Sequence, residues 1–163
     1  MISVRKIVHL CLLLLIAPFI KSQTEGLELR NKILFAIPDL NLENKILFIN
    51  VWQSGDFLSR QNNKEFLRVS EIYKGAKLKS GLKGVCYINI SLDSDNTIWE
   101  ISLKKDSVMS RNSFNVDSKR FDEVLKYFGN KTGSRVISSN GEIISRDLKK
   151  ENCFSLFKSF ITR

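Results

Sequence analysis

The sequence is poor in histidine, proline and cysteine. Its only histidine, His9, lies in an apolar N-terminal segment, so the rest of the chain has none. That absence excludes Ser-His and Cys-His catalytic pairs and histidine-based zinc sites from everything after this segment. The two prolines, Pro18 and Pro38, and the three cysteines leave few rigid turns and few thiols. We therefore expect no metal ion and no cofactor, and the sequence offers no catalytic residue.

Acidic residues are in the minority, since 17 Asp and Glu stand against 26 Lys and Arg. Removal of the first 22 residues takes away three basic side chains and leaves a basic excess of six. This excess is spread along the chain, without a dense basic tract or interleaved aromatic residues. Such a distribution favours a solvated surface, and nucleic acid is not an expected partner.

Residues 1–22 have the pattern of a secretory signal peptide. Arg5 and Lys6 form a positive start, an apolar run follows, and Ser22 offers a small residue near a cleavage point. The run is shorter than the ~20 apolar residues of a membrane span, so no transmembrane span is expected once the segment is removed. Because Ile20 departs from the small-residue pattern of cleavage sites, an uncleaved N-terminal anchor stays an alternative. The segment predicts a periplasmic or secreted protein.

Two apolar runs predict strands. Residues 46–51 and 84–92 are short and rich in branched apolar side chains, which is typical of strands buried on both faces of a sheet. Between them, Asp56 is a suitable N-cap for a helix that ends at Gly75. Residues 23–44, before the first run, are interpreted as an N-terminal extension or an edge strand.

The second half of the chain alternates helices with a hairpin. A short helix is expected around Trp99, and another at residues 121–128. Residues 134–146 have a hairpin pattern, in which Asn140-Gly141 predicts a tight type I′ turn with positive φ at both positions. A terminal helix follows, with Cys153 on its apolar face.

These elements predict one α/β domain over residues 45–163. Parallel strands need a crossover helix, which the first two strands have, while a hairpin adds an antiparallel pair. A three-layer sandwich, with a mixed central sheet of four to five strands and helices on both faces, buries all of the apolar stripes.

The segment from Lys45 to Arg60 resembles the thioredoxin superfamily, and most closely its secreted bacterial thiol-disulfide oxidoreductase (redoxin) branch. There the strand ends in Trp-Ala-Ser-Trp-Cys-x-x-Cys, and Trp52, Ser54 and Arg60 match this frame. The resemblance extends over residues 38–162 through the order of the later elements, including Ile90-Ser91-Leu92-Asp93 followed by Trp99.

The chain departs from this family where the redox chemistry takes place. Asp56 and Ser59 stand where the two cysteines would be, and Thr132 stands where the family has a cis proline. A carboxylate and a hydroxyl supply neither the thiolate nucleophile nor the resolving sulfur of disulfide exchange. A non-proline cis bond costs about 2.5–4 kcal/mol, so a trans bond is expected before Thr132.

The resemblance implies a candidate contact surface for an extended peptide. Its residues surround the degenerate active-site turn: Trp52, Ser54, Gly55, Asp56, Phe57, Ser59 and Thr132. Asp56 as a helix cap is favoured over an acid or base, because a helix N-terminus stabilises the ionised carboxylate. Ser59 has no basic partner to activate it, and Trp52 is more typical of a core or shelf residue than of a ligand stack.

Two cysteines follow the signal-like segment. Cys86 lies in the second predicted strand and Cys153 on the apolar face of the last helix. Two separate buried thiols are expected. A structural disulfide between them and a relocated redox pair are the alternatives.

The leading hypothesis is an exported, redox-inactive thioredoxin-like domain that acts as a protein-binding or scaffold module. Its expected partner is an extended segment of another envelope protein. One alternative is a divergent thiol-disulfide oxidoreductase that uses Cys86 and Cys153, or one of them with a partner's thiol. Another is a basic protein that adheres to anionic envelope surfaces.

Overall fold

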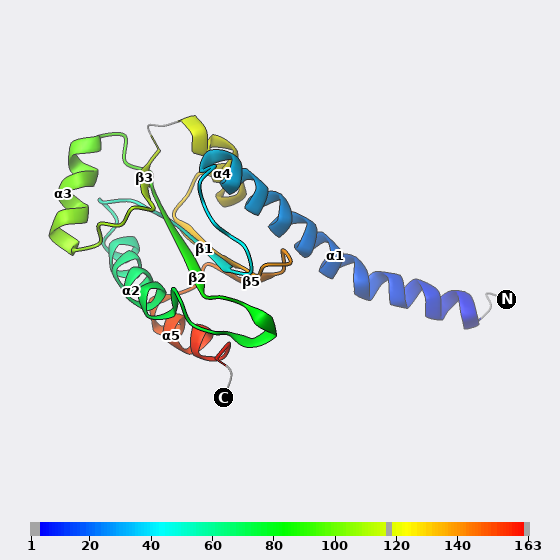
Figure 1. Cartoon of the computed structure of the whole chain (residues 1–163). Helices are drawn as coiled ribbons and strands as arrows, with labels where there is room; N and C mark the ends of the chain where they lie inside the picture. The colour runs from blue at the N-terminus through cyan, green and yellow to red at the C-terminus, as the bar shows by residue number, and fades with distance from the viewer. Residues whose placement is uncertain (1–3, 117–118, 162–163) are drawn as a thin grey trace.

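The computed structural model describes residues 4–116 and 119–161, with side chains from Ala17 onward. Its centre is a five-stranded sheet of order β3-β2-β1-β4-β5 (Figure 1). Strands β1, β2 and β3 are parallel to one another. Strand β4 pairs with β1 in antiparallel orientation, and β5 pairs with β4, also antiparallel. The strands are β1 Ile46–Trp52, β2 Val85–Ser91, β3 Ser113–Asn115, β4 Gly133–Ile137 and β5 Ile143–Arg146.

The two apolar runs form the middle of this sheet, as predicted. All seven residues of β1 and all seven of β2 are buried, because helices cover both faces and other strands flank them. The sequence pattern missed β3, a three-residue strand in a segment rich in Ser and Asn. Its short length and partly buried side chains give no strand periodicity.

Helices α2 (Phe57–Tyr73) and α5 (Lys150–Lys158) cover one face of the sheet (Figure 1). Phe48 is the centre of this layer, with its ring 4.9 Å from Phe66 and 5.4 Å from Phe157. The opposite face is covered by α1 (Val4–Ala36) and α4 (Asp122–Leu125). The predicted three-layer α/β sandwich is therefore confirmed.

Short elements complete the fold around these layers. Helix α3 (Asn96–Asp106) follows β2 and lies beyond the carboxyl end of the strands (Figure 1). Three 3-10 turns, Lys79–Gly81, Lys119–Phe121 and Lys126–Phe128, lie before β2 and on either side of α4. The predicted helices around Trp99 and at residues 121–128 thus exist, the second as α4 with its flanking 3-10 turns.

Of the two alternatives for residues 23–44, an N-terminal extension or an edge strand, the edge strand is wrong. Residues 23–36 are the C-terminal part of α1, and Leu29, Ile33 and Ala36 are buried against the sheet. Their spacing of four and three residues puts them on one helical face. No strand of the sheet comes from this segment.

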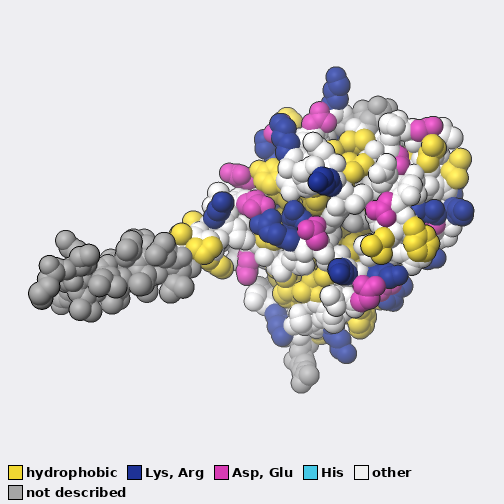
Figure 2. All heavy atoms as spheres, turned by 180° about the vertical axis from the view of Figure 1, so that it is seen from behind, with side chains coloured by type: hydrophobic (Ala, Val, Ile, Leu, Met, Phe, Trp, Pro, Cys, Tyr) yellow, Lys and Arg dark blue, Asp and Glu magenta, His cyan; other side chains and the backbone are white. Residues whose placement is uncertain are grey.

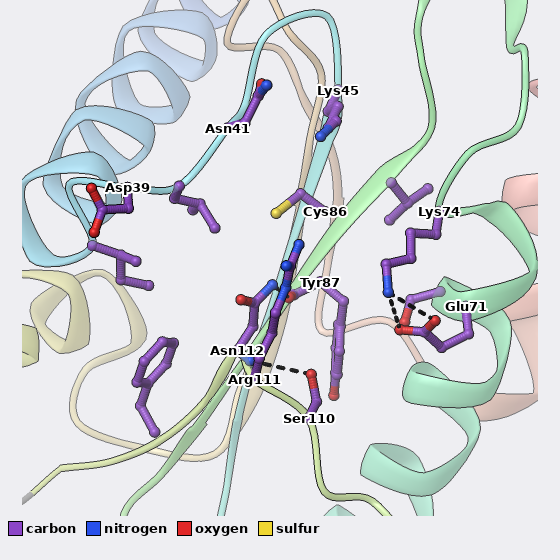
Figure 3. Close-up of a pocket in the computed structure, with 15 residues that line it drawn as sticks. Asp39, Asn41, Lys45, Glu71, Lys74, Cys86, Tyr87, Ser110, Arg111 and Asn112 are labelled. Carbon is purple, nitrogen blue, oxygen red and sulfur yellow. Dashed lines mark hydrogen bonds and ion pairs between the residues drawn. The ribbon is translucent and has the colours of Figure 1, made fainter.

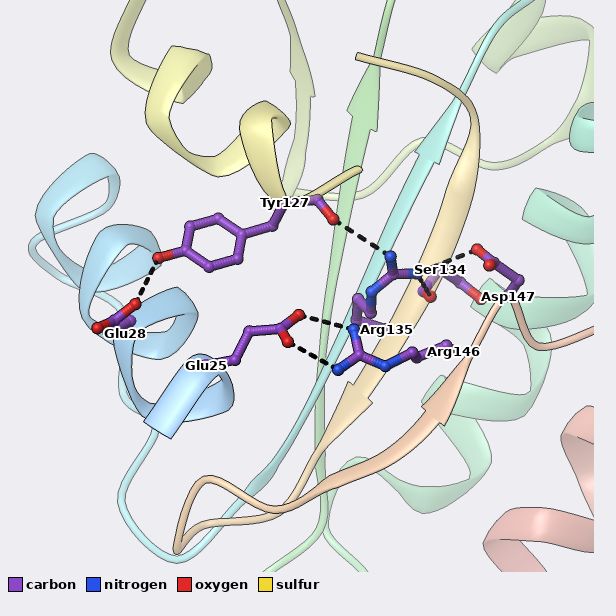
Figure 4. Close-up of polar contacts among 7 residues, drawn as sticks. All are labelled: Glu25, Glu28, Tyr127, Ser134, Arg135, Arg146 and Asp147. Atoms are coloured by element: carbon purple, nitrogen blue, oxygen red, sulfur yellow. Dashed lines mark hydrogen bonds and ion pairs between the residues drawn. The ribbon is translucent and has the colours of Figure 1, made fainter. Parts of the chain in front are cut away.

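Polar contacts fix this part of α1 to the domain (Figure 4). Glu25 forms a two-point ion pair with Arg146 of β5, at 2.6 and 2.8 Å, and Tyr127 donates to Glu28 over 3.1 Å. Gly26 passes so close to Gly141 that a Cβ at residue 26 would lie 2.0 Å from the Gly141 carbonyl oxygen. Residues 23–36 therefore belong to the folded domain.

The N-terminal half of α1 extends away from the body of the molecule (Figure 1). The backbone passes residue 22 as continuous helix, and within the described side chains Gln23 bonds to the sheet side, since its Nε2 donates to the Asn140 carbonyl over 3.2 Å. Among the residues that the structure describes, none of the helices combines the length and apolar character of a bilayer span. Signal cleavage near Ser22 stays a prediction.

The hairpin between β4 and β5 exists, but its predicted type I′ turn is wrong. Gly141 has a φ of +88°, whereas Asn140 is not among the residues with positive φ. Ser138 accepts from the Gly141 N–H and donates to the Glu142 carbonyl, at 3.2 and 2.9 Å. The loop is longer than two residues and has glycine in the left-handed position, a form in which only one residue needs positive φ.

Candidate functional site

The turn between β1 and α2, residues 53–56, is held by a buried carboxylate from the neighbouring strand end. Asp93 accepts from the Ser54 hydroxyl over 2.7 Å and from the Ser54 N–H over 3.1 Å. Its other oxygen accepts from the Ser91 hydroxyl over 2.6 Å. The Ser54 side chain therefore points to Asp93 inside the turn and has a structural role.

Sequence reasoning did not place Asp93 in the site. A usable signal was present, because β1 and β2 are parallel neighbours with Trp52 paired to Ser91. The carboxyl ends of parallel neighbours meet at one edge of the sheet, so a polar residue just after β2 faces the turn after β1.

Asp56 caps helix α2, as predicted. Its Oδ1 accepts from the backbone N–H groups of Leu58 and Ser59, at 3.0 and 3.2 Å, and its backbone is extended. These are two of the four N–H groups that a helix start leaves without partners. The carboxylate is therefore committed to the helix start.

Ser59 is buried, and its hydroxyl closes the turn from inside. Its Oγ accepts from the Gln53 N–H over 3.2 Å and lies 3.0 Å from the Gln53 carbonyl oxygen and 3.1 Å from that of Asp56. These partners are backbone groups, and none is a base. The Ser59 side chain therefore stabilises the turn through backbone partners.

Trp52 does not belong to the contact surface. The side chain is 0% exposed and packs with Leu103 and Val108 beneath α3. The prediction of Trp52 as a surface residue is wrong, and its interpretation as a core residue is correct. It is the last residue of a strand that is buried throughout, and α3 covers it from above.

The remaining predicted site residues lie on an open surface beside the turn. We call this the β1–α2 surface and define it as Gly55, Asp56, Phe57, Leu58 and Thr132. Phe57 is 74% exposed and Leu58 62% exposed, although both are large apolar side chains. A Cβ at Gly55 would meet no atom within 4 Å.

Thr132 reaches this surface through strand pairing. Val51 of β1 pairs with Gly133 of β4, so Thr132 lies beside the carboxyl end of β1, where the resemblance placed it. It is exposed, and the described peptide bonds, the one before Thr132 included, are trans as expected.

Arg60, the third residue of the resembling frame, fixes α2 to α3. Its guanidinium donates to both Asp106 oxygens, from Nε over 2.7 Å and from a terminal nitrogen over 2.5 Å. Hydrogen bonding to Asp106 raises the pKa of Arg60 above its usual range. The pair joins the first turn of α2 to the end of α3 and so holds the helix that covers Trp52.

The two thiols lie on opposite faces of the sheet. Cys86 belongs to the core layer under α1 and α4, and Cys153 to the layer under α2 and α5. Both are free, so the predicted alternatives of a disulfide and a relocated redox pair between them are wrong. Burial raises the pKa of the Cys86 thiol and raises that of Cys153 to about 12.

Within residues 17–116 and 119–161, no three His, Cys, Asp or Glu side chains gather closely enough to hold a metal ion. The β1–α2 surface itself has one carboxylate, Asp56, and that carboxylate is bonded to backbone N–H groups. This surface therefore offers the exposed apolar side chains of Phe57 and Leu58 as a contact area.

No protein-family model and no curated protein matches the sequence. Solved structures do match. The thioredoxin domain of a thiol-disulfide oxidoreductase from Bacteroides vulgatus has 15% identity and a TM-score of 0.60, over 73% of this chain and 81% of that one. A thioredoxin-like protein from Parabacteroides distasonis has 19% identity and a TM-score of 0.57, over 72% and 83%.

A thiol-disulfide oxidoreductase from Bacteroides fragilis has 25% identity and a TM-score of 0.52, over 71% of this chain and 81% of that one. Identities this low establish the fold and do not establish an activity. Together with the sheet order, the crossover helix and the position of the turn after β1, they show that the chain has a thioredoxin-like fold, the fold of these bacterial proteins.

Proposed function

We propose that this protein is an exported thioredoxin-like module without disulfide-exchange activity, and that it binds an extended segment of another envelope protein at the β1–α2 surface. The observation that carries the proposal is the state of the turn. The side chains at the two cysteine positions, Asp56 and Ser59, are engaged in structural hydrogen bonds, while Phe57 and Leu58 beside them are exposed.

The loss of redox chemistry follows from where the sulfur atoms are. Disulfide exchange needs an accessible thiolate and a second sulfur within reach. Cys86 is 9% exposed and Cys153 is 0% exposed, the sheet separates them, and burial raises the pKa of both thiols. Neither lies at the β1–α2 turn, so a mixed disulfide cannot form there.

The binding role is supported by two adjacent exposed apolar side chains beside the β1–α2 turn. Phe57 and Leu58 are adjacent on the first turn of α2, next to Gly55, which leaves room for an approaching chain. Large side chains in this state are a common feature of contact sites. Thr132, which comes just before β4, is exposed beside the same turn, and a position at the end of a strand pair suits an extended segment.

Export is supported by the sequence of residues 1–22 and by the extent of the folded contacts. Gln23 bonds to the sheet side, so a chain cut after residue 22 keeps Glu25, Gly26 and Leu29 in place. Mass spectrometry of the protein's N-terminus in the exporting cell tests this point, and a retained residue 1–22 segment would favour the uncleaved anchor.

Site-specific photo-crosslinking tests the binding role. A photoreactive phenylalanine analogue at Phe57 should capture a discrete partner in the envelope, whereas the same analogue at Ile72 should not. Ile72 is the matched control because it is apolar, 52% exposed and on the same helix. Identical products from both positions, or none from Phe57, would contradict the proposal.

An insulin-reduction assay tests the absence of redox activity. Turnover above background that disappears in Cys86→Ser would favour the divergent oxidoreductase that pairs Cys86 with a partner's thiol. The adhesion alternative predicts steep salt dependence of envelope binding. Lys and Arg are dispersed among acidic side chains on the face that Figure 2 shows, which supports the binding module over the adhesion protein.

A further inference from the structure

A hollow lies far from the β1–α2 surface, beside the beginning of β2 (Figure 3). We call it the Cys86 cavity. Its volume is about 370 Å³, and its walls come from α2, the loop before β3 and the segment after α1. Lys45, just before β1, lines it, whereas the turn follows Trp52 at the other end of that strand. At about 3.3 Å per strand residue, the two places are roughly 20 Å apart.

The cavity lies at an incomplete edge of the sheet. β2 pairs with β1 along its whole length, but β3 pairs only with Asn89, Ile90 and Ser91. The outer edge of β2 before Asn89 therefore has no neighbouring strand. Val85, Cys86 and Tyr87 from this edge line the cavity.

Backbone donors face this hollow. Asn89 donates its N–H outward to the Asn112 carbonyl over 3.0 Å, and the Tyr87 carbonyl accepts from the Asn112 side chain over 3.1 Å. Alternate residues of a parallel strand direct both backbone groups to the same side. The N–H groups of Tyr87 and Val85 therefore point toward the cavity, beyond the reach of the β3 ladder.

Positive side chains are directed into the same space. Lys45 and Arg111 extend toward Cys86 in Figure 3, and neither forms an ion pair within the described residues. Lys74 is neutralised by Glu71, at 3.1 Å. Asp39 lies at the far side of the cavity, beside the end of α1. The field at the centre is therefore positive, and an anion there would meet two unpaired cations and the backbone donors of an open strand edge.

The remaining lining is mixed: Asn41, Ser70, Ser110 and Asn112 are polar, and one wall is apolar. Ile37, Leu40 and Phe114 form a wall on the α1 side. A volume near the lower end of the ~300–1,000 Å³ range of ligand pockets suits a small organic molecule. We propose that the Cys86 cavity binds a small organic anion, a carboxylate carried on an apolar body, with Lys45 and Arg111 at the carboxylate and the apolar wall around the body.

Cys86 provides a reporter, because its sulfur faces the cavity in Figure 3 while Cys153 is fully buried. The full chain with Cys11→Ser is treated with iodoacetamide, and the rate of Cys86 alkylation is followed by peptide mass. The probes are 4-phenylbutyrate and its neutral amide, which share one apolar body. We expect phenylbutyrate to slow alkylation at a concentration about tenfold lower than the amide needs. A tenfold difference in affinity corresponds to about one charge-assisted hydrogen bond.

The double variant Lys45→Gln/Arg111→Gln should weaken protection by phenylbutyrate about tenfold or more and leave the amide unchanged. Lys79→Gln/Lys105→Gln is the control, because it makes the same charge change at exposed positions that do not line the cavity. Both variants should melt at the temperature of the parent, since the four side chains are on the surface or at the cavity mouth.

Amide chemical shifts provide the second readout, which does not depend on alkylation. Phenylbutyrate should move the N–H resonances of Val85 and Tyr87. Equal binding of the carboxylate and the amide, binding that the Lys45→Gln/Arg111→Gln variant leaves unchanged, or shifts confined to residues 55–59 would each overturn the proposal. The last result would leave the β1–α2 surface as the site of anion contact and would not test its peptide binding.

Discussion

The two ends of the β1–β2 pair differ in how their polar groups are used. At the carboxyl end, the side chains of Ser54, Asp56, Ser59 and Asp93 form hydrogen bonds to one another or to backbone groups. At the amino end, Lys45 and Arg111 are without ion partners among the described residues, and the edge of β2 is open. The carboxyl end, where the family resemblance places the active-site turn, has its polar side chains hydrogen-bonded. The amino end, which carries no part of the resembling motif, has positive side chains without ion partners among the described residues.

This difference separates a turn whose polar side chains are occupied from an open strand edge. At the turn, Asp56 accepts from the N–H groups at the start of α2, and the Ser59 hydroxyl lies within hydrogen-bond distance of the Gln53 and Asp56 carbonyl oxygens. Substitutions at the turn and at the buried Cys153 thiol of α5 measure how much of this arrangement is structural.

Asp93→Ala should cause the largest loss of stability, about 3 kcal/mol in the free energy of unfolding. The substitution leaves the buried donors of Ser54 and Ser91 without an acceptor, and hydrogen bonds to a charged group are worth about 1.5–3 kcal/mol each in mutational series. Urea denaturation measures it. A loss below about 1 kcal/mol would mean that water replaces the carboxylate, and the turn would then be less dependent on Asp93 than its geometry indicates.

The next effect is on the pH dependence of stability, and it separates the two faces of the sheet. Burial raises the pKa of Cys153 to about 12 from 9.0, so the thiol ionises in the unfolded chain before it does in the folded one. Its contribution is fully present below pH 9 and is lost as the pH rises toward 12, at up to about 1.4 kcal/mol per pH unit.

Urea melts of the parent and of Cys153→Ala, in reductant at pH 8 and pH 10.5, isolate this contribution. The parent should lose about 2 kcal/mol more than the variant between the two values. Lysine titration affects both proteins equally and cancels in the difference, whereas the pKa values of Tyr73 and Tyr87, which burial and then the Cys153 charge raise, fall slightly in the variant. Equal losses would show that Cys153 is more accessible than its burial indicates.

Asp56→Ala should destabilise the fold by about 0.5–2 kcal/mol, because two N–H groups at the start of α2 lose their acceptor. Asp56→Ser should recover most of this loss, since a hydroxyl also caps. Chemical denaturation gives both values. If Asp56→Ala unfolds like the parent while crosslinking through Phe57 disappears, Asp56 acts as a contact residue, and the carboxyl end is less structural than the comparison states.

The sequence predicted those parts of the fold that local patterns encode. The buried strands followed from continuous apolar runs, and the start of α2 followed from Asp56 ahead of an apolar stripe. The order of elements then predicted a mixed sheet with helices on both faces, which the structure has. Residues 23–36 were missed although Leu29, Ile33 and Ala36 have helical spacing, because the two-faced sheet that buries them is a tertiary feature.

The candidate site was predicted less completely, for physical reasons. Trp52 is a core residue because α3 covers it, which no pattern around residue 52 indicates. Asp93 acts across a strand pair, and β3 is too short to show periodicity. Cys86 and Cys153 are separated because the Cys86 side chain points to the face of the sheet opposite α5. The cavity exists because β3 pairs with only part of β2.

The smallest effect expected is on catalysis, when the thiol motif is put back. In Asp56→Cys/Ser59→Cys the two sulfur atoms would be three residues apart at a helix start, where side chains are neighbours and where the helix N-terminus lowers the pKa of a thiol. We expect an internal disulfide under mild oxidation, measured by the loss of two free thiols. Insulin reduction should rise only slightly, because Thr132 does not restore the proline that the family has beside this turn.

Thr132→Pro, added to the double variant, should raise the activity further, because Val51–Gly133 pairing places residue 132 at the end of β1. The control is the single variant Thr132→Pro, which lacks the two introduced cysteines and should remain inactive. If the double variant folds but its thiols do not close, residues 56 and 59 do not occupy the two cysteine positions. The structural completeness of the carboxyl end would then be an original feature of this turn and not a replacement for lost chemistry.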